Sequence, residues 1–428
     1  NKPEIDSVIY PDGYDLIFNF HNTTGDTASI GYLYLDGIRF DSIITKRLSS
    51  YFNAGGKPDT LNHHNTWYFG GGGIYPGTMY SPAEVISNGD YSIGITFQYP
   101  IMEYKHYTFF RVETSSAVGG LHWGLILGLN TNDMGIHTSE GDLLPGEKRS
   151  YKMTVRIMRK TETCKHWLEL LDPYKQYFHK MYGGVTYDRD PRPIAGVMYC
   201  MTEFISDINP YGFVPNPIIK NPFDHGFESM VKFINDTVYG AHGYKRVLYW
   251  TPTGLSKTNN LNYPNKFTSH WLEGDTNKYP HSYGHKMEDA IERFASLAKD
   301  DRTLGLWWGR SVEVMTEWDS KNWSYLNPDD TAMVNHSYRE IDLAVKAGAT
   351  EIGLDQFSLP KFWHLYKWAK MMRIHYPQIH FGQEQGSSDY MNAVMPFYYY
   401  SSRLPSQHYI ADYLLPGNEV IGAISNHW

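Results

Sequence analysis

The chain has 428 residues, of which 41% are hydrophobic and 20% are charged, as in a globular protein of one or two domains. A formal net charge of −8 argues against nucleic acid or an anionic membrane surface as the main partner. No apolar run approaches the roughly 18 residues that a bilayer span needs, so membrane insertion is not expected. Aromatic residues make up 16% of the chain, and they serve either to pack β-structure or to stack on the apolar faces of sugars.

Residues 1–160 show the alternation of apolar and polar side chains that is typical of β-strands. The segments "YSIGITF" (91–97) and "YKMTVRIM" (151–158) alternate in this way, and similar short strands recur before them. Gly, Pro and Asn separate the strands, and no convincing helical pattern interrupts them. We therefore predict an N-terminal β-sandwich over residues 1–160.

The pattern changes after residue 160. Residues 161–189 are predicted to form a helical linker, and residues 190–428 alternate between strands and helices. The expected strands are 193–204, 244–254, 303–314, 350–355, 379–385, 392–400, 407–417 and 419–425. The first four are followed by expected helices around 226–238, 285–301, 331–347 and 360–377. Eight strands in about 240 residues predict a (β/α)₈ TIM barrel. An open doubly wound sheet is the alternative, and the lack of a glycine-rich phosphate loop after the first strand disfavours it.

Two acids stand where consecutive predicted strands end. The segment "IGLDQF" ends strand four on Asp355, and "FGQEQ" places Glu384 on strand five. Catalytic groups of such barrels lie at the C-terminal ends of the strands. Neighbouring strands are about 4.8 Å apart, which matches the roughly 5–5.5 Å between the carboxyl groups of retaining glycosidases. We predict Asp355 as the nucleophile and Glu384 as the acid/base, whereas a separation of about 6.5–9.5 Å would favour inversion.

Further residues near the same strand ends are predicted to bind the sugar. They are Glu203, Trp250, Trp307, Trp308, Arg310, Gln356 and Asp412. Because adjacent residues of a strand point to opposite faces, at least one of Trp307 and Trp308 is expected to pack inside the protein. For any single acid at a strand end, a helix cap or a structural ion pair is the competing interpretation. The matched positions of Asp355 and Glu384 favour catalysis.

A predicted β-sandwich followed by a barrel with these two segments resembles the barrel glycoside hydrolases that act on α-linked sugars. In the α-amylase and dextranase-like groups, the nucleophile is an Asp that ends strand four and the acid/base is a Glu that ends strand five. The resemblance assigns these roles to Asp355 and Glu384, and a stabilising acid of strand seven would fall near Asp412. Two features depart from the α-amylases, since Gly353 stands where they have an Arg and their strand-three Asn-His signature is absent. The α-galactosidase-like group places its acid/base after strand six, where "MPFYYYSSRLP" offers no acid.

Other chemistries have less support. His63 and His64 are adjacent, unlike the i, i+4 pair of a helical zinc site. No GxSxG elbow is present, and Cys200 lies inside a predicted strand. We therefore expect no cofactor, although the acidic loops leave a structural Ca²⁺ site open.

Together these patterns predict a retaining glycoside hydrolase that acts on an α-linked poly- or oligosaccharide and is secreted or displayed on a cell or virion surface. The alternative is a non-catalytic carbohydrate-binding or attachment protein on a glycosidase-like barrel. Such a binder needs aromatic platforms but no matched pair of carboxylates. The sugar, its linkage, endo or exo action and the oligomeric state are left open.

Overall fold

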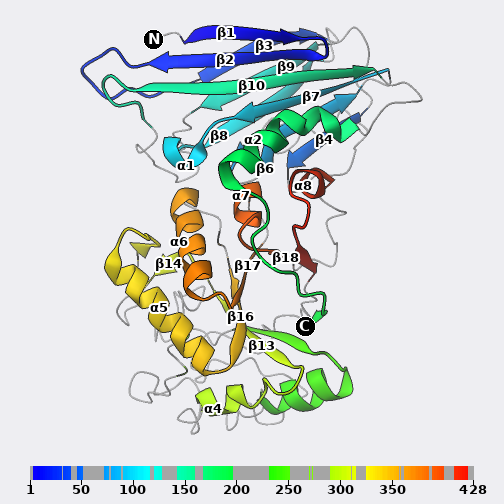
Figure 1. Ribbon diagram of the computed structural model, residues 1–428, viewed down its shortest axis with the longest axis vertical. Coiled ribbons are helices and arrows are strands. Elements are labelled where there is room, and N and C mark those ends of the chain that lie inside the picture. Colours follow the sequence, from blue (N-terminus) through cyan, green and yellow to red (C-terminus); the bar gives the residue numbers. More distant parts are fainter. Residues whose placement is uncertain are drawn as a thin grey trace. The chain divides into compact units, whose positions relative to one another are not determined.

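The computed structural model divides the chain into two compact units (Figure 1). Unit 1 comprises Asn1–Val185, Gly386–Ala393 and Pro405–Asn418, and unit 2 comprises Thr186–Gln385, Val394–Leu404 and Glu419–Trp428. The structure describes residues 3–30, 32–39, 46–51, 72–76, 79–87, 90–115, 120–127, 142–159, 167–195, 231–250, 269, 272, 290–309, 311–314, 324–355, 357, 361–384, 388–399 and 409–422. The domain bounds predicted from the sequence, 1–160, 161–189 and 190–428, stay a prediction.

Two antiparallel sheets make up most of unit 1. The six-stranded sheet has the order β1-β2-β10-β7-β6-β4, with β1 (Glu4–Tyr10), β2 (Gly13–His21), β4 (Lys46–Tyr51), β6 (Met79–Ser87), β7 (Tyr91–Gln98) and β10 (Lys148–Arg159). The four-stranded sheet has the order β3-β9-β8-β5, with β3 (Tyr32–Arg39), β5 (Gly72–Tyr75), β8 (Thr108–Ser115) and β9 (Gly120–Leu127). The predicted antiparallel strands are therefore present, and their arrangement as a sandwich stays a prediction.

Helical segments pack on β7 of unit 1. A 3₁₀-helix (η4, Trp167–Leu171) leads into α2 (Asp172–Tyr182), which confirms the helix predicted here. Gly94 permits the close approach, because a Cβ at that position would lie 2.5 Å from the Leu170 Cβ. The Gln98 side chain also donates to the Pro173 carbonyl at 3.0 Å. The unit further contains α1 (Ile101–Tyr104), α7 (Asp389–Asn392) and α8 (Tyr409–Leu414).

Unit 2 is built on a nearly closed barrel of parallel strands. Among the described residues, seven strands pair in chain order: β11 (Ile194–Ala195), β12 (Arg246–Trp250), β13 (Thr303–Trp308), β16 (Ala349–Leu354), β17 (His380–Glu384), β18 (Phe397–Tyr399) and β19 (Val420–Gly422). A short hairpin, β14 (Glu313–Val314) with β15 (Ser324–Tyr325), follows β13. Consecutive parallel neighbours joined by helices are the hallmark of a TIM-like barrel.

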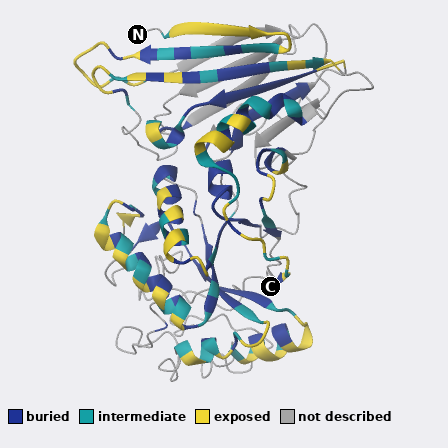
Figure 2. Cartoon of the chain, in the orientation of Figure 1, coloured by how far each residue is buried: buried dark blue, intermediate teal, exposed yellow. Residues whose placement is uncertain are grey.

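Among the described residues of unit 2, four helices lie near the predicted positions. They are the π-helix η6 (Ile234–Ala241), α4 (Ala290–Ala295), α5 (Thr331–Lys346) and α6 (Phe362–His375). Helix α5 begins at the N-cap Asp330, whose side chain accepts from the Ala332 amide at 2.9 Å. Figure 2 shows buried and exposed residues alternating along α5, as expected for a helix with one apolar face.

The strand predicted over 407–417 is wrong, because this segment forms helix α8 in unit 1. Its buried side chains recur with the helical rather than the strand period: Ile410, Ala411, Leu414 and Leu415. Gly417, with a φ of +96°, follows the helix. The described part of the barrel therefore shows seven of the eight predicted strands.

Two glycines make room for two large rings inside the barrel. The inward-facing core joins Ile194, Leu248, Trp307, Tyr398 and Ile421. A Cβ at Gly353 would lie 2.0 Å from the Trp307 ring, and a Cβ at Gly382 would lie 1.8 Å from the Tyr398 ring. The two rings meet edge to face, with centroids 5.6 Å apart. The absence of a side chain at Gly353, where the α-amylases carry Arg, therefore has a packing reason in this chain.

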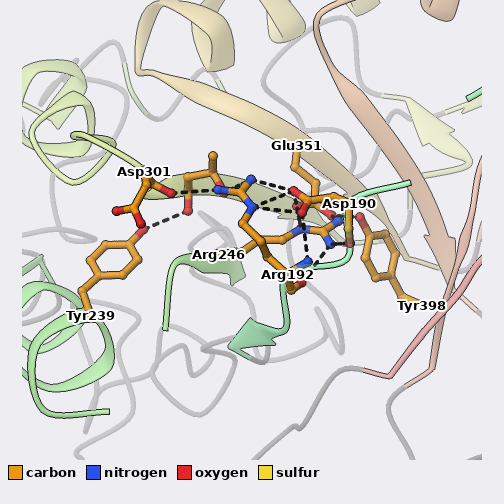
Figure 3. A network of polar contacts seen from close by, with 8 residues as sticks. Asp190, Arg192, Tyr239, Arg246, Asp301, Glu351 and Tyr398 are labelled. Carbon is orange, nitrogen blue, oxygen red and sulfur yellow. Dashed lines mark hydrogen bonds and ion pairs between the residues drawn. The ribbon is translucent and has the colours of Figure 1, made fainter. Parts of the chain in front are cut away.

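A buried ion pair lies towards the N-terminal ends of the strands. Arg246 donates to Glu351 from Nε at 2.8 Å and from Nη2 at 2.6 Å, and both side chains are almost fully buried. The Tyr398 hydroxyl also donates to Glu351. Figure 3 shows Arg246 and Glu351 gathered with Asp190 and Arg192. The hydrogen bond from Arg192 lowers the pKa of Asp190 to about 2. Asp190 and Glu351 are therefore each paired with an arginine.

We expect Gly353→Ala to destabilise the protein by about 1–3 kcal/mol, because the new methyl group overlaps the Trp307 ring. Urea unfolding measures this. In a Trp307→Leu background the same change should have a smaller effect, since the ring is absent. Gly25→Ala is the control, because a Cβ there meets nothing within 4 Å. Equal effects of Gly353→Ala in both backgrounds would contradict the packing explanation.

Arg246→Met should lower the free energy of unfolding by about 3–5 kcal/mol, because it leaves the Glu351 carboxylate buried without its main cation. Arg246→Met with Glu351→Gln should have a smaller effect than the sum of the two single changes, since no uncompensated charge remains. A double-mutant cycle by chemical denaturation measures the coupling. Strict additivity would contradict the pairing as a source of stability.

Candidate active site

The backbone of Asp355 is held from both directions at the end of β16. Its amide donates to the Trp308 carbonyl at 2.9 Å. Its carbonyl accepts from the Ser311 amide at 3.0 Å and from the Ser311 hydroxyl at 2.7 Å. The Asp355 residue is 2% exposed. The β13–β16 pairing thus continues one residue beyond the strand and fixes the point from which the carboxyl group projects.

The register of β16 and β17 brings Asp355 and Glu384 to the same level. Gly353 pairs with Gly382, and Leu354 pairs with Gln383, so the next step in both chains reaches Asp355 and Glu384. Alternation places these two residues on the same face as the two glycines, which is the barrel interior. Two carboxyl groups therefore stand on the inner face at the C-terminal ends of neighbouring strands, whose spacing is about 4.8 Å.

The inward positions of β16 form three successive levels. Glu351 belongs to the ion pair, Gly353 faces the Trp307 ring, and Asp355 stands at the C-terminal end. Inward side chains in layers are typical of TIM barrels, in which active sites occupy the C-terminal face and the opposite face serves stability. The buried Trp307 ring therefore lies between the ion pair and the level of the two acids, and the Tyr398 ring packs against it edge to face.

The predicted tryptophans have different environments. Trp307 and Trp308 are both fully buried, and Trp308 donates to the Ser269 hydroxyl at 3.1 Å from the opposite face of the strand. The expectation that at least one of them packs is confirmed, and a sugar-binding role for either stays a prediction. Trp250 ends β12 and pairs in register with Trp307, but its side chain is outside the described part of the chain.

Of the four other predicted sugar-binding residues, the structure describes Asp412 alone. Glu203, Arg310 and Gln356 lie outside the described residues. Asp412 lies on α8 in unit 1, where it is exposed and accepts from the Asn418 side chain at 3.1 Å. Because α8 is not a barrel strand and lies between β18 and β19 in the chain, Asp412 belongs to the connection between these two strands. An acid therefore does follow the sixth strand, further along the chain than the segment "MPFYYYSSRLP".

A buried carboxyl group at the start of α7 was not among the predicted site residues. Asp389 is fully buried and accepts from the hydroxyls of Tyr75 at 2.7 Å and Tyr174 at 2.6 Å, and from the Tyr390 amide at 2.8 Å. Burial raises the pKa of Asp389 from 3.8 to about 7, against the opposing effect of these hydrogen bonds. The tyrosines lie 314 and 215 residues away in sequence, so no local pattern could reveal the cluster.

Neither a metal cluster nor a membrane helix is found in the described residues. No three His, Cys, Asp or Glu side chains there are gathered so that they could hold a metal ion. Within the same ranges, no helix has both the length and the apolar character for crossing a bilayer.

No family model and no curated protein sequence matches the chain. Among solved structures, it is similar to an α-galactosidase from Thermus thermophilus in complex with stachyose, with 9% identity and a TM-score of 0.43 over 97% of this chain and 83% of that one. It is also similar to a β-arabinopyranosidase, with 11% identity and a TM-score of 0.39 over 90% of this chain and 52% of that one. A pullulanase from Bacillus acidopullulyticus follows, with 9% identity and a TM-score of 0.27 over 93% of this chain and 70% of that one.

All three neighbours are glycoside hydrolases by name. This chain spans about half the length of the arabinopyranosidase.

We expect the stability that Asp389 contributes to fall as the pH rises. Its pKa is about 7 in the folded chain and about 3.9 in an unfolded one, so the folded state binds the extra proton between these values. The contribution is complete below pH 4 and is lost as the pH passes 7, a change of roughly 4 kcal/mol.

Urea unfolding of wild type and Asp389→Asn between pH 4 and 8 measures this contribution. The difference in stability between the two proteins should shrink as the pH rises. Asp26→Asn, an exposed acid of the same unit, controls for the loss of one charge. A difference that stays constant with pH would contradict the raised pKa.

Proposed function

We propose that this chain is a retaining glycoside hydrolase in which Asp355 is the nucleophile and Glu384 is the acid/base. The observation that carries the proposal is the shared register of these two acids on the inner face of neighbouring parallel strands. The strand spacing of about 4.8 Å is close to the roughly 5–5.5 Å between carboxyl groups that a retaining mechanism uses.

The two acids have environments suited to different roles. Asp355 is almost fully buried and has a backbone fixed by three hydrogen bonds, as a nucleophile that must meet one carbon atom requires. Glu384 is partly exposed, so water and a departing sugar can reach it. The asymmetry supports assigning the attack to Asp355 and the proton transfer to Glu384.

The reaction follows from these positions. The Asp355 carboxylate forms a bond to the anomeric carbon while the glycosidic C–O bond breaks, and Glu384 gives its proton to the departing oxygen. Glu384 then takes a proton from water, whose oxygen attacks the same carbon and releases the Asp355 carboxylate. Two inversions at one carbon give net retention, and no metal or cofactor is needed.

The substrate is proposed to be an α-linked oligo- or polysaccharide, on the resemblance of the two strand-end segments to the α-acting barrel hydrolases. Glu203, Trp250, Arg310 and Gln356 are proposed to line the sugar subsites from the loops at the same strand ends. A secreted location, or one on a cell or virion surface, belongs to the same proposal.

The test compares Asp355→Asn, Glu384→Gln and Asp412→Asn on two kinds of substrate. Against α-linked polysaccharides, measured by reducing-sugar release, the first two changes should each lower kcat/KM by about 10²–10⁴-fold. On nitrophenyl α-glycosides, whose leaving group needs no proton, Glu384→Gln should keep most of its activity in the bond-breaking step, whereas Asp355→Asn should not. NMR of the first-formed product should show retained configuration.

Several outcomes would redirect the proposal. If Asp412→Asn rather than Glu384→Gln shows the dependence on the leaving group, the acid/base is the acid after the sixth strand. Full activity of Asp355→Asn would remove it as the nucleophile. Glycan binding by wild type without hydrolysis of any substrate would favour the non-catalytic carbohydrate-binding alternative.

A further inference from the structure

A groove of about 570 Å³ lies within unit 1, on the face of the six-stranded sheet that carries η4 and α2 (Figure 1). Small-molecule sites usually have volumes of about 300–1,000 Å³. The strand register identifies the face: Asp15 is opposite Thr154, which is opposite Thr96, so these side chains point the same way. The Cβ position of Gly94 lies on this face too, against Leu170 of η4. The groove is therefore bounded by strands on one side and by η4 and α2 on the other.

A polar network centred on Asp15 forms the floor of the groove. Asp15 is 3% exposed, and its Oδ2 atom accepts from the Lys152 ammonium at 3.2 Å and from the Tyr10 hydroxyl at 3.3 Å. The Arg156 Nη1 atom lies 2.9 Å from Asp15 Oδ1 but donates its hydrogen bonds to two backbone carbonyls. Within the described residues, Asp15 Oδ1 accepts no hydrogen bond. A buried acceptor of this kind is uncommon and indicates a donor from water or a ligand at the floor.

The Tyr10 ring is held in place and still has an accessible surface. Its hydroxyl donates to Asp15, and the Arg156 guanidinium lies over the ring, 4.5 Å from its centroid. The residue is 39% exposed and lines the groove. A side chain that is already ordered loses little freedom when a ligand binds, so the fixed ring is suited to stacking against a flat apolar surface.

Two carboxyl groups at the edge of the groove are available to a ligand. Asp12 lies in the turn between β1 and β2, and its carbonyl accepts from the Ile157 amide at 2.6 Å, which joins the turn to β10. Glu169 lies on η4, at the opposite side of the groove. Among the described residues, neither the Asp12 nor the Glu169 carboxyl group forms an ion pair or a hydrogen bond. The exposed Gln176 amide of α2 adds a further donor and acceptor.

These groups match a neutral sugar better than an ion. The carboxylates of Asp12 and Glu169 repel an anion, whereas the Lys152 and Arg156 cations repel a positively charged ligand. A sugar hydroxyl both donates and accepts, so it can bond to a carboxylate and to an ammonium in the same groove. The apolar face of a sugar ring fits against an aromatic side chain such as Tyr10.

We propose that the groove binds a neutral oligosaccharide: a sugar ring stacks on Tyr10, its hydroxyls donate to Asp12 and Glu169, and Lys152 donates to a hydroxyl oxygen. This inference goes beyond the proposed function, because binding here breaks no bond and every residue that lines the groove belongs to unit 1. The Asp15 network gives the floor its shape, so Asp15 is left unchanged in the test.

The binding test uses the full chain with Asp355→Asn and Glu384→Gln, so that a bound sugar is not cleaved. An array of neutral α- and β-linked oligosaccharides selects the probe, and calorimetry measures its Kd. In this background Tyr10→Ala should raise Kd by about 10-fold, because the stacking surface is lost, and Tyr10→Phe by less. Glu169→Gln should raise Kd by about 3–10-fold, because a charged acceptor is lost.

Tyr91→Ala is the matched control for Tyr10→Ala. Tyr91 is 41% exposed and has the Arg159 guanidinium 6.0 Å from its ring centroid, but it does not line the groove. Its replacement should leave Kd unchanged. An array without any neutral oligosaccharide that binds, or a Kd that Tyr10→Ala and Tyr91→Ala affect alike, would overturn the proposal. Spermidine or inorganic phosphate that binds in a Tyr10- and Glu169-dependent way, in place of a sugar, would assign the groove to an ion instead.

Hydrogen exchange locates the bound sugar without any enzymatic activity. The Ile157 amide, which is bonded to the Asp12 carbonyl beside the groove, should exchange more slowly when the oligosaccharide is bound. The Thr303 amide, bonded to the Lys245 carbonyl in unit 2, should not change. Binding that leaves Ile157 exchange unaltered would place the sugar outside the groove.

The two proposals fail separately. If the wild type cleaves no substrate but Tyr10→Ala and Glu169→Gln weaken binding, the groove inference stands and the proposed hydrolase function fails. If Asp355→Asn and Glu384→Gln abolish hydrolysis as expected and the groove variants bind like the control, the proposed function stands and the groove inference fails.

Discussion

The parallel register of β13, β16, β17 and β18 is the constraint on which the site depends. It sets Trp307 opposite Gly353 and, one strand further on, Gly353 opposite Gly382. Because neither glycine has a side chain, the Trp307 and Tyr398 rings can occupy the space beside them while the strands keep their register. A shift by one residue in any of these pairings would turn the inward side chains outward, and with them both candidate catalytic acids.

Charged residues occupy two levels along the barrel strands, and the packing described above separates these levels. Towards the N-terminal ends, Glu351 forms an ion pair with Arg246 and accepts a hydrogen bond from Tyr398. Asp190 forms an ion pair with Arg192. Beyond the Trp307 ring, the C-terminal level carries Asp355 and Glu384. An interior of low polarity strengthens electrostatic interactions at both levels, which concerns the ion pair at one end and the proposed chemistry of the two acids at the other.

Segments far apart in the chain belong to the same unit. Segments that follow β17 and β18 in sequence pack in unit 1, where α7 is held by tyrosines from β5, α2 and β6. Helix α7 therefore belongs to the hydrophobic core of unit 1. The buried Asp389 carboxyl group makes this cluster sensitive to protonation near neutral pH.

The sequence by itself determined the strand and helix order over most of the barrel, because apolar periodicity reports burial directly. It also placed acids at two strand ends, from which the shared level of Asp355 and Glu384 could be predicted. It misassigned 407–417 as a strand, since a short apolar run fits either period until its partners are known. Only the tertiary structure decided that Gly353 and Gly382 accommodate two rings, and that Asp389 meets Tyr75 and Tyr174. These contacts join residues far apart in the chain, where no local pattern constrains them.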